Sequence, residues 1–106
     1  MATEDEYIEK VKALVLDNID RERYAVFLFG GRARGRRGKA VDIDVGILGK
    51  ASLPLESLTH IQEVLDESSV PLHVDLVDFH TADPQFRTIA MSDIIIWNQP
   101  SIIKIS

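Results

Sequence analysis

The chain has 106 residues, of which 45% are hydrophobic and 27% are charged, and its formal net charge is -5 at pH 7. This length suits one domain with a modest core and excludes two, so we expect a single domain over residues 1–106. No apolar run is as long as a membrane span, and the acidic N-terminus does not resemble a signal peptide. The chain lacks cysteine, which excludes disulfides and thiolate metal sites. We therefore expect a soluble protein of the cytoplasm without membrane association.

Hydrophobic spacing predicts three helices and three strands before the C-terminal segment. Apolar residues at helical spacing predict helices over residues 6–19, 52–68 and 83–91. Runs rich in β-branched and aromatic residues predict strands over residues 24–29, 41–48 and 72–79. This order predicts an α/β or α+β domain, with a small mixed β-sheet flanked by helices.

The C-terminal segment allows two interpretations. Residues 94–105 contain seven isoleucine and tryptophan side chains, and Pro100 prevents one continuous strand through them. The segment either completes the core as a last strand or forms a docking surface for a partner. The sequence alone favours neither.

Positive charge is concentrated in one glycine-rich segment. Residues 30–39 hold five of the twelve Lys and Arg side chains and no acidic one. A protein that binds a nucleic-acid duplex would spread positive charge along a face, so we expect no direct nucleic-acid binding. A single basic loop suits a compact anion, such as the phosphates of a nucleotide.

Three aspartates are candidates for a metal site. Asp42 and Asp44 lie two residues apart on a predicted strand, so both side chains point to one face. Bare carboxylates at this spacing raise each other's pKa, and magnesium or manganese would remove that conflict. On the next strand Asp75 and Asp78 point to opposite faces, and we choose Asp75 because its apolar neighbours anchor that part of the strand in the core. This third carboxylate would align and deprotonate a hydroxyl nucleophile.

The glycines that follow the first predicted strand complete the candidate site. Gly30 and Gly31 allow the backbone to approach a ligand closely and to offer N–H groups to phosphate oxygens. Arg32 and Arg34 in the same loop are expected to contact the nucleotide or a partner. A phosphate cradle beside a metal site is typical of phosphoryl or nucleotidyl transfer.

These motifs resemble a known superfamily. A strand, Gly-Gly, a loop, Asp-x-Asp and a later lone Asp are similar to the nucleotidyltransferases that include DNA polymerase β. The segments FGGRARG, VDIDVGIL, VDLVDF and ADPQFRTIA resemble the minimal nucleotidyltransferases, which are often paired as antitoxins with HEPN-domain toxins. The resemblance covers about residues 24–95. This sequence departs from the usual family pattern at two positions. The commoner form has serine where Gly31 stands, and serine is frequent where Val41 stands.

The resemblance implies a polymerase β-like fold, with ATP as substrate and two magnesium ions as cofactor. It implies that Asp42, Asp44 and Asp75 bind metal and that Gly30 and Gly31 hold the phosphates. The implied reaction is transfer of AMP to a tyrosine hydroxyl of a HEPN toxin, within a complex of the two proteins. A protein acceptor is expected because small-molecule nucleotidyltransferases normally add a second domain. The alternative is a non-catalytic module that neutralises its partner by masking a surface.

Overall fold

The structure, a computed structural model, describes residues 2–105. Its helices and strands are α1 (Glu4–Asp17), β1 (Ala25–Phe29), α2 (Gly30–Ala33), β2 (Ile43–Leu48), α3 (Leu55–Asp66), β3 (Val74–Asp78), α4 (Pro84–Ala90) and β4 (Ile95–Asn98). All six elements predicted upstream of the C-terminal segment are present, with ends that differ by three residues or fewer. The short helix α2 lies in the basic loop.

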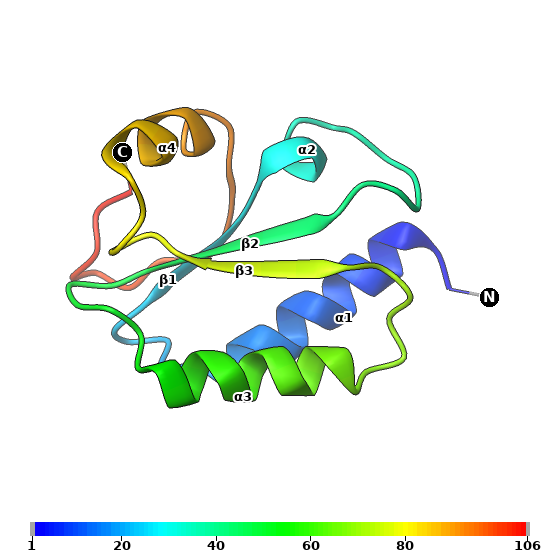
Figure 1. The fold of residues 1–106 in the computed structure, drawn as a ribbon, viewed down its shortest axis with the longest axis horizontal. Helices are drawn as coiled ribbons and strands as arrows, with labels where there is room; N and C mark the ends of the chain where they lie inside the picture. Colours follow the sequence, from blue (N-terminus) through cyan, green and yellow to red (C-terminus); the bar gives the residue numbers. More distant parts are fainter. Residues whose placement is uncertain (1, 106) are drawn as a thin grey trace.

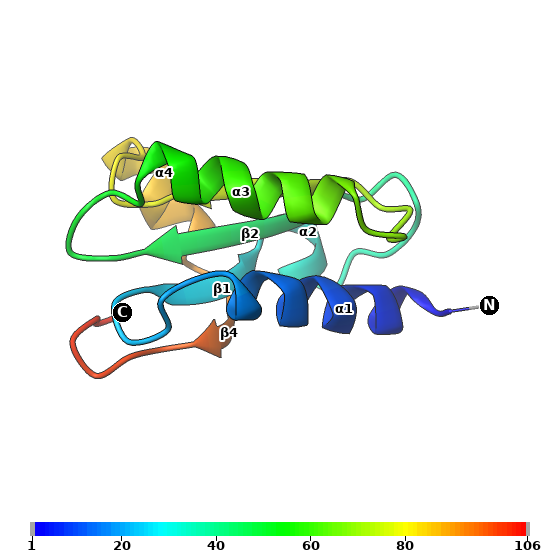
Figure 2. The ribbon, with the colours of Figure 1, turned by 90° about the horizontal axis from the view of Figure 1, so that it is seen from below.

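The four strands form one mixed sheet in the order β3-β2-β1-β4. Strands β2 and β3 are parallel and joined through α3, whereas β1 is antiparallel to both β2 and β4. Helices α1 and α3 cover one face of the sheet, and α2 and α4 lie over the other (Figure 1). Figure 2 shows α1 and α3 side by side on their face. The prediction of a small mixed sheet flanked by helices is confirmed.

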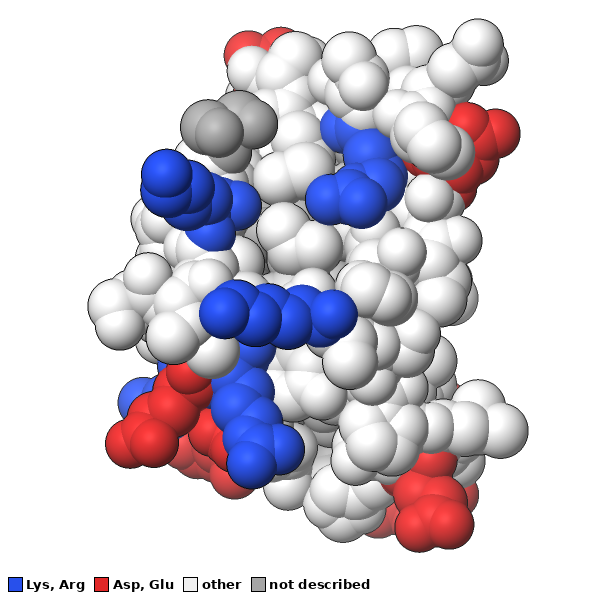
Figure 3. Space-filling model, turned by 90° about the vertical axis from the view of Figure 1, so that its left-hand side faces the viewer, with Lys and Arg blue, Asp and Glu red and all other residues white. Residues whose placement is uncertain are grey.

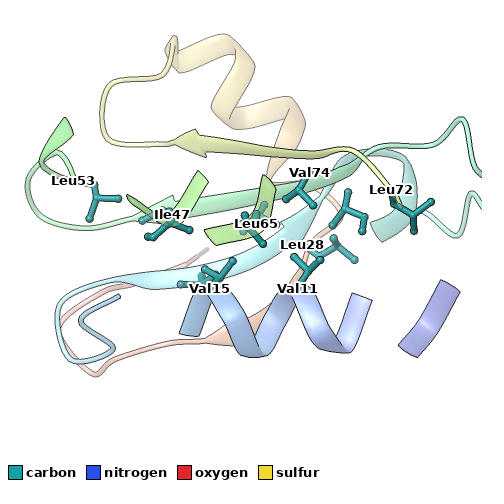
Figure 4. Packing of buried hydrophobic residues seen from close by; sticks show 12 residues of the cluster. Val11, Val15, Leu28, Ile47, Leu53, Leu65, Leu72 and Val74 are labelled. Atoms are coloured by element: carbon teal, nitrogen blue, oxygen red, sulfur yellow. The ribbon is translucent and has the colours of Figure 1, made fainter. Parts of the chain in front are cut away.

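The main core lies between the sheet and the pair α1 and α3 (Figure 4). Alternate residues of β2, namely Ile43, Val45 and Ile47, are fully buried there. Val11 and Val15 of α1 pack against the same cluster. Because side chains alternate along a strand, the residues between them, including Asp44, face the side of α4.

The side of the sheet under α4 carries a second, aromatic core. Phe27, Phe29 and Phe79 are buried in it together with Ala90 of α4. Gly46 of β2 belongs to this face, and a Cβ there would collide with the rings of Phe27 and Phe79. This face of β2 carries both Gly46 and Asp44. Aromatic side chains cover it at Gly46, and it is open near Asp44, toward the start of the strand.

Helix α1 begins two residues earlier than the hydrophobic pattern predicts. Thr3 is its N-cap, and the Thr3 hydroxyl accepts a hydrogen bond of 3.2 Å from the backbone N–H of Glu6. The Glu6 carboxylate accepts in return from the Thr3 backbone N–H. This capping box satisfies N–H groups of the first turn, so the helix extends into the acidic N-terminus.

The C-terminal segment contributes to the core and also exposes apolar side chains. Strand β4 pairs with β1 as an edge of the sheet, and Ile103 is buried in the aromatic core. By contrast, Ile95, Ile96 and Ile102 are 46–49% exposed. The core-completing interpretation therefore holds for Ile103, while three isoleucines remain on the surface.

Basic side chains are not confined to the glycine-rich loop. Figure 3 views the end of the molecule away from the N-terminus and shows Lys and Arg side chains across its middle, with Asp and Glu mainly toward its corners.

Within residues 2–105, no helix combines the length and the apolar character needed to cross a membrane.

Two neighbouring isoleucines provide a test of the second core. We expect Ile103→Ala to destabilise the fold by about 2–4 kcal/mol, because it leaves a cavity beside the aromatic cluster. The matched control Ile102→Ala changes a half-exposed side chain and should alter the free energy of unfolding by about 0.5 kcal/mol or less. Urea unfolding of both variants measures the difference. Equal effects at the two positions would contradict the buried position of Ile103.

Candidate functional site

Two of the three candidate carboxylates lie next to each other in the sheet. Asp44 of β2 and Asp75 of β3 are register partners in the parallel pair. Neighbouring strands lie about 4.8 Å apart, so the two side chains leave the same face close together. Asp44 is partly buried and Asp75 is exposed. The pairing register thus assembles two carboxylates at the open end of the face beneath α4.

The electrostatics of this pair are unfavourable. Burial raises the pKa of Asp44 above its ordinary value of 3.8, and the negative charges of Asp75 and Asp42 raise it further. His73 acts in the opposite direction and lowers that pKa. A cation bound between the carboxylates would relieve the repulsion.

Asp42 stands apart from the pair. It is exposed and precedes the first residue of β2, although its charge still acts on Asp44. In the part of the chain that the structure describes, no three His, Asp or Glu side chains are close enough together to hold a metal ion. Magnesium in nucleotide sites is commonly held by one or two carboxylates together with substrate phosphates. Asp44 and Asp75 therefore fit a magnesium ion that binds together with a nucleotide.

The backbone of Gly30 passes close to the side chain of Asp44. It follows Phe29, the register partner of Asp44, and has a φ of 73°, which favours glycine. A Cβ at Gly30 would collide with Oδ2 of Asp44. Gly31 is tighter than most positions, because a Cβ there would lie 3.3 Å from side-chain atoms of Arg36 and Val41. Gly30 therefore allows the backbone to pack beside Asp44, whereas the space at Gly31 is bounded by Arg36 and Val41, and Gly31 does not line the cavity that contains Asp44.

Arg32, which the sequence suggested as a nucleotide contact, is buried and pairs with an acidic residue of α1. Its side chain is 2% exposed, and its Nη1 forms a 2.8 Å ion pair with Glu4 at the start of α1. It also donates hydrogen bonds to the carbonyls of Val41 and Gly38 at 3.0 and 2.9 Å. The Gly38 N–H donates to the same Glu4 oxygen at 2.9 Å. Arg32 thus connects the basic loop to α1. Each of its three side-chain nitrogens donates a hydrogen bond to Val41, Glu4 or Gly38.

Arg34, the other arginine suggested as a nucleotide contact, is partly exposed and lines the cavity beside Asp44. Its side chain is 45% exposed, and its Nε lies 3.6 Å from Oδ2 of Asp93, in the turn that precedes β4. At this exposure and distance the ion pair contributes little stability, so a phosphate could replace Asp93 as the partner of Arg34. Of the two arginines proposed from sequence, Arg34 alone borders the cavity beside Asp44.

A cavity of about 330 Å³ joins these groups. Its walls are formed by the end of β1 and the start of α2, by the two carboxylates and by α4; the lining residues are Phe29, Gly30, Arg34, Asp44, Asp75, Val77, Phe86, Ile89 and Ala90. One wall is polar and the other is apolar. Larger hollows of about 490 and 780 Å³ lie elsewhere, and neither is lined by any of the three candidate aspartates.

Asp78, the carboxylate that the sequence left aside, has a structural role. Its Oδ2 accepts a 2.9 Å hydrogen bond from the N–H of Leu53, and its Oδ1 accepts one of 2.9 Å from the N–H of His80. It thereby fixes the turns around the end of β3. The alternation of side chains places it on the opposite face from Asp75.

The sequence interpretation missed two features of this region. The partner of Arg32 is Glu4, 28 residues away, and local spacing cannot reveal such a contact. The apolar wall comes from α4, where Phe86 and Ile89 are 42% and 66% exposed. The signal available in the sequence was the presence of two large apolar side chains, Phe86 and Ile89, three residues apart in the helix predicted over residues 83–91.

Comparison with known proteins identifies a family and several similar folds. Residues 9–101 match the model of the polymerase beta nucleotidyltransferase family. The chain is 35% identical over 66 residues to the probable protein adenylyltransferase MntA of Haemophilus influenzae. That alignment covers 62% of this chain and 58% of MntA, so the chain spans less than two thirds of this relative.

Solved structures share the fold at low sequence identity. A mutant toxin–antitoxin complex of MntA and HpeT has a chain with a TM-score of 0.71 and 21% identity, over 89% of this chain and 74% of that one. A toxin–antitoxin structure with AMP-PNP gives a TM-score of 0.70 and 23% identity, over 94% and 77%. A tri-AMPylated HEPN toxin of Shewanella oneidensis in complex with an MNT antitoxin gives 0.66 and 21%, over 94% and 75%. These similarities establish a shared polymerase β-like fold.

The raised pKa of Asp44 predicts a specific dependence of stability on pH. A group whose pKa is higher in the folded state stabilises the fold least when it is ionised, so Asp44 costs stability at neutral pH and not below its ordinary pKa of 3.8. We expect Asp44→Asn to raise the melting temperature slightly at pH 7. The gain should shrink as the pH falls through the raised pKa of Asp44 toward 3.8, and it should be absent below that value. A variant that melts earlier at pH 7 would contradict the repulsion.

Glu4 predicts the opposite dependence. The hydrogen bond from Arg32, followed by that from the Gly38 N–H, lowers the pKa of Glu4 below its ordinary value of 4.5. Its contribution to stability is therefore present above that value and is lost as the pH falls through the lower, folded-state pKa. We expect Glu4→Gln to lower the melting temperature at pH 7, with a difference that narrows in acid. Thermal melts from pH 7 to pH 3 test this, and a difference that stayed constant would exclude the ionised pair as its cause.

Proposed function

Because this chain belongs to the polymerase beta nucleotidyltransferase family, we propose that it is a protein adenylyltransferase that transfers AMP from ATP to a hydroxyl group of a partner protein. The observation that carries this proposal is the pairing of Asp44 with Asp75 beside Gly30, in a cavity that Arg34 also lines. The relative MntA, a probable protein adenylyltransferase, supports AMP as the transferred group.

The proposed partner is a HEPN-domain toxin, with this chain as its antitoxin. Support comes from the similar folds, which include an MNT antitoxin bound to a tri-AMPylated HEPN toxin and a toxin–antitoxin structure with AMP-PNP. The proposed acceptor is a tyrosine hydroxyl of that toxin. We propose the cytoplasm as the place of action, because the reaction consumes ATP.

The residues of the cavity divide the work of the proposed reaction. The acceptor oxygen forms a bond to the α-phosphorus of ATP, the bond to the bridging oxygen breaks, and pyrophosphate leaves. Gly30 allows the triphosphate to lie close to the backbone, and Arg34 can exchange Asp93 for a phosphate oxygen. Asp75 is the exposed member of the pair, so an acceptor hydroxyl can reach it and pass its proton to this carboxylate.

Magnesium is the proposed metal, with Asp44 and Asp75 as direct ligands and Asp42 as a further carboxylate at the entrance of β2. When bound, the ion would neutralise phosphate charge and stabilise the attacking and leaving oxygens. Hard oxygen ligands suit magnesium or manganese. The carboxylates line the end of the cavity that would take the phosphates. Without a cation, their negative charges would repel the triphosphate.

Transfer should depend on Asp44 and Asp75 and not on Asp78, which lies on the same strand as Asp75. We expect Asp44→Asn and Asp75→Asn to reduce AMP transfer by more than about 100-fold, since even outer-shell changes around a metal commonly cost about 10–100-fold. The matched control Asp78→Asn lies three residues from Asp75 on β3 but serves the Leu53 and His80 turns. It should lower stability and retain transfer below its melting temperature.

The measurement uses ATP labelled at the α-phosphate, magnesium and a HEPN partner co-purified with the chain. Covalent label on the partner, lost with Asp44→Asn and Asp75→Asn, supports the proposed enzyme. Neutralisation of the partner without any label would instead support the non-catalytic module. Equal transfer by all three variants would remove the two aspartates from the reaction.

A further inference from the structure

The apolar wall of the cavity has no task in phosphate chemistry. Val77 of β3 and the α4 residues Phe86, Ile89 and Ala90 face the same cavity as Asp44. Phe86 is 42% exposed and Ile89 is 66% exposed, although both belong to a small domain that needs apolar burial. A cavity with one polar wall and one apolar wall fits a ligand that has a charged end and an apolar end.

Phe86 presents a ring whose orientation is fixed by other aromatic residues. Its ring lies edge-to-face with Phe29 at a centroid distance of 6.0 Å and an interplanar angle of 88°. It also contacts Phe79 at 5.6 Å and 41°. Phe29 and Phe79 are themselves buried and packed edge-to-face at 5.0 Å. The partly exposed ring is therefore supported from beneath, and ligand binding would cost little side-chain entropy.

The spacing of Asp75 and Val77 along β3 suits the layout of a nucleotide. Val77 follows Asp75 by two residues on the same face of β3, which is about 6.6 Å along a strand. Transfer of AMP requires the α-phosphate to lie at Asp44 and Asp75. The base is separated from that phosphate by one ribose, so the base reaches the wall formed by Val77 and Phe86.

We propose that Phe86 is the base-stacking residue of the nucleotide site and that it takes the purine ring of ATP. This inference rests on the proposed function and adds the residue that recognises the nucleoside. Stacking on an aromatic ring is a common source of affinity for nucleobases. Ile89 and Val77 line the same cavity as Phe86 and would cover part of a stacked base.

The other flat group in the reaction, the acceptor tyrosine, fits this wall less well. A docked partner protein supplies its own binding energy for the acceptor and has to approach opposite the leaving pyrophosphate. ATP, as a small molecule, is recognised through the residues that line its own site. The buried aromatic support beneath Phe86 therefore suits the nucleotide better than a side chain presented by another protein.

The test compares a ligand that has a base with one that has none. AMP-PNP and inorganic tripolyphosphate, each with magnesium, are titrated into the full chain by calorimetry. We expect Phe86→Ala to weaken AMP-PNP binding about tenfold or more and to leave tripolyphosphate binding unchanged. Phe86→Leu preserves most apolar contact with Phe29 while removing the aromatic face, and should also weaken AMP-PNP. The control Ile102→Ala changes an exposed apolar side chain outside the cavity and should affect neither ligand.

Each outcome bears on the inference. A selective loss of AMP-PNP affinity in both Phe86 variants, with melting temperatures above the assay temperature, supports it. Unchanged AMP-PNP affinity overturns it and leaves the proposed function standing; loss of partner modification in the same variants would then assign the ring to the acceptor. Equal weakening of both ligands shows a general distortion of the site and also overturns it. Failure of the unchanged chain to bind AMP-PNP overturns the inference together with the proposed function.

Discussion

The side-by-side position of Asp44 and Asp75 is the constraint on which the site depends. The parallel pairing of β2 and β3 makes them register partners, and α3 connects the two strands across the opposite face. Two like charges on a partly buried face destabilise the folded state. The raised pKa of Asp44 reflects this, since burial and the neighbouring charges disfavour its ionised form. The fold tolerates this cost because its main core, between the sheet and α1 with α3, lies on the other side. The cation site that we propose is therefore built at the expense of local stability.

The surroundings of the pair follow from the same arrangement. Gly30 has to be glycine because Asp44 occupies the space of a side chain there. The Arg32–Glu4 ion pair then fixes the loop that follows Gly30 onto α1, and this leaves Arg34 at the cavity. The basic loop therefore divides into a buried arginine that shapes the site and an exposed arginine that can meet a ligand.

Much of this was predictable from sequence, and the failures have physical causes. Alternation along β2 and β3 correctly separated the core side chains from Asp44 and Asp75, because each strand has a period of two. The burial of Arg32 was not predictable, because composition shows a cluster of cations but not that Glu4 reaches one of them from 28 residues away. The capping box of Thr3 and Glu6 was legible in the sequence and would have corrected the start of α1. The aromatic layer over Gly46 required the sheet register.

The most direct test of the central claim is the affinity of the unchanged chain for AMP-PNP, measured by calorimetry with saturating magnesium and again with excess EDTA. If Asp44 and Asp75 form a cation site that is completed by phosphate oxygens, binding should be strong with magnesium and nearly lost in EDTA, because the bare carboxylates repel the triphosphate. The same affinity under both conditions would contradict the account, since it would mean that the nucleotide binds without using the carboxylate pair.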